Sequence, residues 1–115
     1  MSGARMYKEK FRPNWKLWLE YKNEYVFGPG AFAILKSIQK AGTITEGAKA
    51  LGMSYRYAWG VVRGIEEKLG ERLLDTRKGG AIGGGGAVVT VLGIKLMELY
   101  SKVQNDFERV VQESR

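Results

Sequence analysis

The sequence predicts a domain that is mainly α-helical with a small β component. Three observations lead to this prediction. Most of the 115-residue chain carries apolar residues at helical spacing, glycines separate the helical segments, and a glycine-rich run over 79–86 stands between two short β-favouring segments. A chain of this length can bury a modest core without disulfides or metal ions.

The charge and the residue types restrict the functions that this chain can have. The 19 Lys and Arg residues exceed the 12 Asp and Glu residues, and the net charge of +7 favours a polyanionic partner. Cysteine and histidine do not occur in the sequence, which removes thiolate metal sites and the commonest catalytic base, so we expect neither a metal site nor an enzyme. The sequence has no apolar run of membrane-spanning length and no secretory signal, so we expect a cytoplasmic protein.

The first 27 residues are expected to form a basic arm followed by a β-hairpin. Residues 1–14 are polar and basic, which is typical of a flexible arm. Apolar and polar residues alternate over 15–21, and a second short apolar run over 25–27 follows a polar pair. Such alternation on both sides of a turn predicts two antiparallel strands.

The segment 29–51 predicts two helices. A proline opens the first, and Gly42 suits the left-handed cap at its end. The buried stripe of this helix consists of Ala31, Ile34, Leu35 and Ile38. The second, shorter helix is expected to begin after Thr45 as its N-cap, while Thr43 with Glu46 fits an alternative capping box.

A third helix over 55–69 completes a helix-turn-helix, with Ser54 as its cap and Gly52 in the tight turn. Its core-facing residues are Ala58, Val61, Val62, Ile65 and Leu69. The opposite face carries Arg56, Gly60 and Arg63, with Tyr55 and Trp59 beside them. A guanidinium can bind guanine edges or phosphates through two hydrogen bonds. The alternative interpretation is a solvated face whose aromatic rings cover the edge of the core.

The glycine-rich run is interpreted as the tip of a β-wing. It lacks the Lys-Ser/Thr pair of a phosphate-binding loop and the βαβ context of a dinucleotide fingerprint, so no cofactor is expected. An anion at the N-terminus of the helix after Thr90 is the minor alternative. Strand-like residues on both sides and the basic pair Arg77 and Lys78 favour a wing that lies close to the sugar-phosphate backbone.

The last predicted helix, over 91–115, carries an apolar stripe that a small domain has little core to cover. The stripe consists of Leu92, Leu96, Leu99, Val103, Phe107 and Val110. The first half is expected to pack on the domain itself. We expect Leu96, Leu99, Val103, Phe107 and Val110 to form a seam with a second copy of the chain.

Three distinctive strings carry a resemblance to a known family: GTITEGAKALGMSYRYAW, TRKGGAIGGGGAVVT and TVLGIKLMELY. With them, residues 30–105 resemble the N-terminal winged helix-turn-helix DNA-binding domain of the ModE molybdate-responsive regulators and, more distantly, that of LysR-type regulators. The resemblance implies that the third helix enters the major groove with Ser54, Tyr55, Arg56, Tyr57 and Trp59. The family's oxyanion-binding domains have no counterpart before Arg115, so molybdate or tungstate binding is not expected.

The sequence as a whole predicts a winged helix-turn-helix domain over 15–90 and a dimerisation helix over 91–115. The expected function is sequence-specific regulation of transcription by a homodimer bound to double-stranded DNA. The residues expected to contact DNA are Thr43, Thr45, Ser54, Tyr55, Arg56, Tyr57, Trp59, Arg63, Arg77 and Lys78. An architectural DNA-binding protein and a protein-binding winged helix are the two alternatives.

Overall fold

The computed structural model describes residues 10–77 and 85–114, and a β-hairpin precedes the helix-turn-helix in it. Strands β1 (Leu19–Tyr21) and β2 (Glu24–Phe27) pair antiparallel around a two-residue turn in which both φ angles are positive. Such a turn matches the right-handed twist of paired strands. The first strand is shorter than predicted, because the segment before Leu19 has no strand facing it and lies beside the last helix instead.

Helices α2 (Pro29–Ala41) and α3 (Ile44–Ala50) follow the hairpin. The expected stripe of α2 is buried, and Gly42 ends the helix in a left-handed conformation. The predicted N-cap of α3 at Thr45 is wrong: the Oγ1 atom of Thr43 accepts a hydrogen bond from the backbone N–H of Glu46 at 3.1 Å. The alternative with Thr43 as the N-cap therefore holds, because its hydroxyl oxygen satisfies an N–H that the helix itself leaves unpaired.

Helix α4 (Tyr55–Leu69) begins and ends where the sequence indicates, with Ser54 as N-cap and Gly70 in a left-handed conformation. The wing strands β3 (Leu74–Thr76) and β4 (Ala87–Val89) pair antiparallel, with Leu74 opposite Val89. Thr90 then caps α5 (Val91–Glu113). The order of these elements is that of a winged helix-turn-helix, which confirms the predicted fold.

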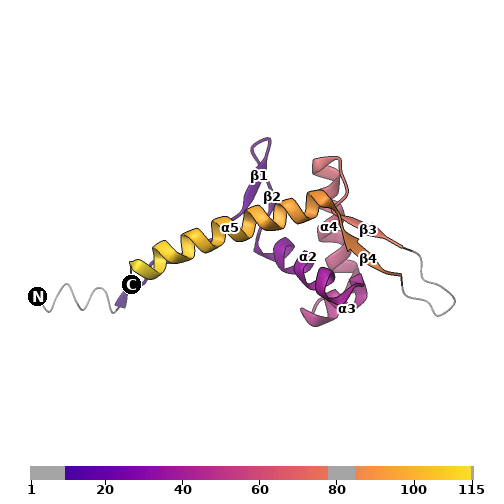
Figure 1. The fold of residues 1–115 in the computed structure, drawn as a ribbon, viewed down its shortest axis with the longest axis horizontal. Coiled ribbons are helices and arrows are strands. Elements are labelled where there is room, and N and C mark those ends of the chain that lie inside the picture. Colours follow the sequence, from indigo (N-terminus) through magenta and orange to yellow (C-terminus); the bar gives the residue numbers. More distant parts are fainter. Residues whose placement is uncertain (1–9, 78–84, 115) are drawn as a thin grey trace, which may run out of the picture.

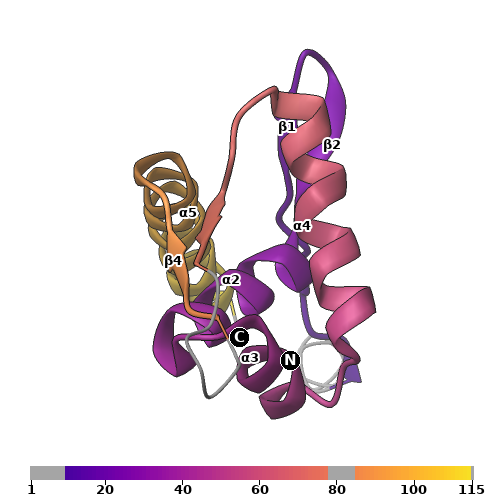
Figure 2. The same cartoon turned by 90° about the vertical axis from the view of Figure 1, so that its right-hand side faces the viewer.

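The core lies where α2, α3, α4 and the start of α5 meet the two pairs of strands. Figure 1 shows α4 and the wing at one end of the molecule, while α5 extends from there toward the opposite end. Figure 2 views the first of these ends, with α4 upright beside the hairpin and α3 below it. No helix in the described ranges is long and apolar enough to cross a membrane.

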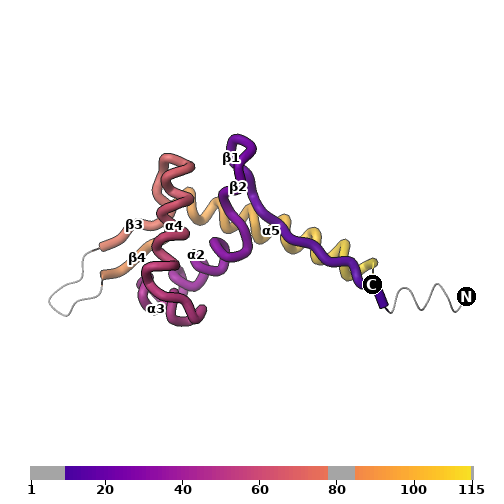
Figure 3. Tube along the Cα trace, turned by 180° about the vertical axis from the view of Figure 1, so that it is seen from behind, coloured from indigo at the N-terminus to yellow at the C-terminus, as the bar shows by residue number. Residues whose placement is uncertain are grey.

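A strap of residues 10–18 lies along the part of α5 that extends beyond the core (Figure 3). The ring of Trp15 stacks on that of Phe107, with the centroids 5.4 Å apart. The hydroxyl of Tyr100 donates a hydrogen bond to the carbonyl oxygen of Leu17 at 3.3 Å. Within the predicted arm, residues 10–14 belong to this strap, whereas residues 1–9 lie outside the described part of the chain.

Candidate nucleic-acid interface

The outward face of α4 is formed by residues opposite its buried side. Ala58, Val62 and Ile65 are buried against the core, whereas Arg56 and Gly60 on the other side are exposed. A Cβ atom added at Gly60 would meet nothing within 4 Å, so the helix backbone is accessible there. This face combines a guanidinium with a stretch of bare backbone, which suits close approach to a polyanion.

The N-terminus of α4 contributes hydroxyl and phenol groups to the same region. The Oγ atom of Ser54 accepts a hydrogen bond from the N–H of Tyr57 at 3.0 Å and thereby fixes the start of the helix. Tyr55 and Tyr57 both expose about half of their surface. Exposed phenols can both donate and accept hydrogen bonds, which suits contact with phosphate or base edges.

Trp59 and Arg63 form a pair on the flank of α4. The indole of Trp59 is half-buried and packs against the core, so it covers the core edge as the alternative interpretation proposed. The guanidinium of Arg63 lies over this ring, 5.6 Å from its centroid, and the Arg63 Nε is 3.9 Å from Glu66 Oε1. This cation–π contact holds the guanidinium above the indole face, while the edge of the guanidinium stays accessible to solvent.

The two threonines of the predicted site occupy different environments. Thr43 is half-buried and uses its hydroxyl oxygen as the cap of α3, whereas Thr45 is exposed in the first turn of that helix. Helix α3 packs against α4, so Thr45 belongs to the same end of the molecule as the outward face of α4.

The base of the wing is closed by backbone hydrogen bonds. The N–H of Arg77 donates to the carbonyl of Gly86 at 2.8 Å, and the N–H of Ala87 donates to the carbonyl of Gly42 at 2.9 Å. The Arg77 side chain is exposed. Lys78 and the glycines up to Gly84 lie outside the described residues, so the predicted contacts of Lys78 and of the wing tip have no structural description.

Glu66, which is not among the residues predicted from the sequence, is a carboxylate that joins α4 to the wing. Glu66 is buried, and its Oε2 atom accepts hydrogen bonds from the backbone N–H groups of Leu73 at 2.8 Å and Leu74 at 3.2 Å. The available signal was an acidic residue, the first of the pair Glu66 and Glu67, directly after the core-facing Ile65. A charge on the inner side of a helix needs a partner in the fold.

The interface thus presents arginines, tyrosines and a wing at one end of a winged helix-turn-helix. The residues from 10 to 77 and from 85 to 114 contain no cluster of acidic side chains that could hold a metal ion. The cations of this site are exposed and spread over a surface, which is typical of domains that contact an extended anionic partner.

Known proteins resemble this chain over most of its length. It is 39% identical over 84 residues to the transcriptional regulator ModE of Yersinia pestis, and 38% identical over 84 residues to the DNA-binding transcriptional dual regulator ModE of Escherichia coli K12. The molybdenum-pterin-binding protein MopB of Rhodobacter capsulatus is 34% identical over 77 residues. These matches confirm the predicted resemblance to the ModE regulators. No family model matches the chain.

The chain corresponds to only part of these relatives. The two ModE alignments cover 73% of this chain but 32% of each regulator, and the MopB alignment covers 67% of this chain and 28% of MopB. Among solved structures, ArgP from Mycobacterium tuberculosis matches with a TM-score of 0.56 and 17% identity, over 73% of this chain and 29% of ArgP. This likeness concerns the fold alone.

Proposed function

We propose that this chain is a DNA-binding transcriptional regulator of the ModE type, which reads double-stranded DNA with α4 and acts as a cytoplasmic homodimer. The observation that carries the proposal is the division of α4 into a buried apolar side and an exposed side with Arg56 and Gly60. The relatives named as transcriptional regulators support it, although the chain spans about a third of their length.

In this proposal α4 lies in the major groove and the wing contacts the backbone. Arg56 and Arg63 supply guanidinium groups that match guanine edges or phosphates with two hydrogen bonds. Tyr55 and Tyr57 contact the phosphates beside the groove, and Thr45 does so from α3. Arg77 neutralises a phosphate near the wing, which adds affinity without sequence preference.

The homodimer is proposed to form through α5. Leu92 and Leu96 pack partly against the domain's own core, as expected. Farther along the helix Leu99 is 49% exposed, Phe107 50% and Val110 56%, even though Trp15 covers one side of Phe107. A second copy presents the same residues and can cover them on both chains at once. Two domains held in this way would read two half-sites, about one helical turn apart.

Selection of binding sites from random duplex DNA, followed by a salt titration, tests the DNA-binding part. We expect one enriched sequence with two related halves, and an affinity that falls steeply with salt, by about 0.9 in log–log slope for each neutralised phosphate. If the selection enriches no sequence, the interpretation as an architectural DNA-binding protein replaces that of a sequence-specific regulator. A flat salt response would contradict DNA binding through phosphates.

Arginine variants separate base readout from backbone contact. Arg56→Ala should weaken binding to the selected site by about 1–3 kcal/mol and random DNA much less, whereas Arg77→Ala should weaken both equally. Arg12→Ala is the matched control, because Arg12 is exposed and belongs to the strap, which lies along α5 rather than on α4 or the wing. The expectations that the chain is no enzyme and does not itself bind molybdate or tungstate stay predictions, and titration calorimetry with each oxyanion tests the latter.

A further inference from the structure

The spacing of the apolar stripe of α5 is that of a coiled-coil seam, and one position of this seam is charged. Leu92 and Leu99 are seven residues apart, and so are Leu96, Val103 and Val110 in succession. These two series alternate with spacings of four and three, as in the seam of a two-stranded coiled coil. The next position of the first series is Asp106, so a carboxylate stands where the pattern calls for an apolar side chain.

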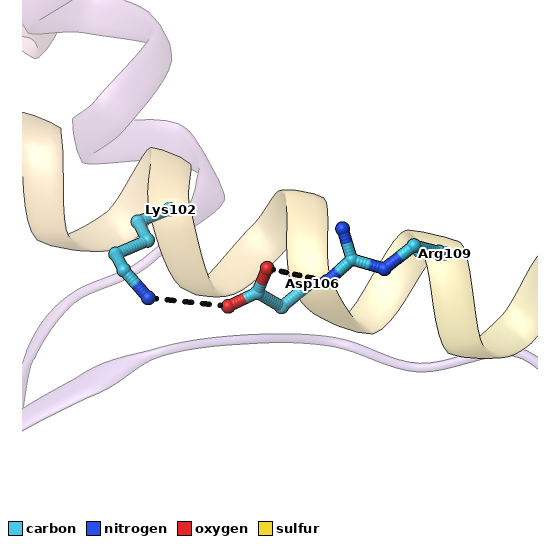
Figure 4. A network of polar contacts seen from close by, with 3 residues as sticks. All are labelled: Lys102, Asp106 and Arg109. Carbon is cyan, nitrogen blue, oxygen red and sulfur yellow. Dashed lines mark hydrogen bonds and ion pairs between the residues drawn. The ribbon is translucent and has the colours of Figure 1, made fainter.

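Asp106 is charged and held by two cations of its own helix. Its Oδ1 atom lies 2.8 Å from a guanidinium nitrogen of Arg109, and its Oδ2 atom lies 3.4 Å from Lys102 Nζ. Figure 4 shows the carboxylate between the two side chains on α5. Hydrogen bonds from Arg109 and Lys102 keep the pKa of Asp106 below its ordinary value, so the group is ionised at neutral pH.

This arrangement opposes packing of a second helix over the middle of the stripe. A partner helix that covers Leu99, Val103 and Val110 must also remove water from the carboxylate and the two cations beside it. Removing water from an ion pair costs free energy, and this cost offsets much of the stabilisation that the attraction between the two charges provides. A single polar residue in a coiled-coil seam is known to lower stability while fixing the register of the helices.

We infer that Asp106 keeps the α5 homodimer weak, so that pairing is completed on DNA rather than in free solution. The inference rests on the proposed homodimer. With the seam weakened at one position, two bound half-sites supply the remaining stabilisation by holding the chains at high local concentration. The free protein then exchanges between one chain and two, and the second chain binds the site cooperatively.

Sedimentation equilibrium of the full chain and its variants tests the inference. Asp106→Leu should lower the dimer dissociation constant by about tenfold or more, and it should reduce the cooperativity of DNA binding because dimers form beforehand. Asp106→Asn keeps the size and a polar group but loses the charge, so we expect a smaller change in the same direction. Gln112→Leu is the matched control, because it adds the same side chain on the opposite flank of α5, and it should leave the dissociation constant unchanged.

The outcomes distinguish this inference from the homodimer itself. If Asp106→Leu leaves the dissociation constant unchanged or raises it while Phe107→Asp still abolishes the dimer, the role of Asp106 is overturned and the homodimer stands. If Gln112→Leu tightens the dimer as much as Asp106→Leu, the effect is general hydrophobicity and the inference also fails. If the original chain and Asp106→Leu remain single chains even on a two-half-site duplex, the proposed homodimer fails, and the inference with it. Circular dichroism of each variant reports whether α5 keeps its helicity.

Discussion

Replacing Glu66 by alanine should destabilise the whole domain, because this carboxylate is the hydrogen-bond acceptor for two backbone N–H groups at the start of β3. Both N–H donors belong to fully buried residues, Leu73 and Leu74. A buried donor left without an acceptor costs about 1–3 kcal/mol, and water that enters the vacated space recovers part of this. We therefore expect Glu66→Ala to lower the free energy of unfolding by about 2–4 kcal/mol.

Urea denaturation followed by circular dichroism measures this change, and two further variants make it specific. Glu66→Gln keeps an acceptor oxygen and loses only the charge, so it should lose about 1 kcal/mol. Glu67→Ala removes the neighbouring exposed carboxylate and should stay within about 0.5 kcal/mol of the original chain. Hydrogen exchange of the Leu73 and Leu74 amides should accelerate in Glu66→Ala. Equal unfolding free energies for the Glu66 and Glu67 alanine variants would refute the role given to Glu66.

Four more changes have expected outcomes. Gly47→Ala should destabilise the domain by about 1–3 kcal/mol in urea denaturation, because its Cβ atom would lie 2.8 Å from the Cα of Ile38. Gly60→Ala should raise the unfolding free energy by about 1 kcal/mol and still weaken DNA binding in a fluorescence anisotropy titration. Phe107→Asp should give a folded single chain in sedimentation, with weaker DNA binding. Since the pKa of Asp106 is lowered, the stabilisation that its carboxylate gives to α5 is present above the ordinary pKa of 3.8 and is lost as the pH falls below that value. Helicity measured between pH 5 and 2 should show this loss.

Local signals in the sequence were sufficient to predict most of the fold. Helix α4 begins after Ser54 and ends at Gly70 as predicted, because a hydroxyl cap and a left-handed glycine act through atoms a few residues away. The choice between Thr43 and Thr45 was harder, because both residues are threonines two positions apart. Thr45 was predicted, but Thr43 is the N-cap, because its hydroxyl oxygen accepts the backbone N–H of Glu46.

Contacts between distant segments were the part that the sequence did not reveal. Trp15 and Leu17 alternate with polar residues as a strand does, yet they lie against α5, and nothing near them in the sequence indicates Phe107 as a neighbour. The hydrogen bonds of Glu66 likewise depend on where the chain returns after Gly70. For the candidate site, the exposed side of α4 followed from helical periodicity, whereas the packing of Trp59 against the core required the structure.

The backbone of Gly42 links the wing to the helix-turn-helix through hydrogen bonds on both sides of the residue. Its N–H donates to the carbonyl of Ile38 and ends α2, and its carbonyl accepts the N–H of Ala87 at the start of β4. A displacement of the wing must therefore turn the same residue that leads into α3. In the proposed complex, a contact between the wing and the DNA backbone would therefore influence the angle at which α4 meets the bases. A side chain at residue 42 would strain this link, because Gly42 has a φ of 86°.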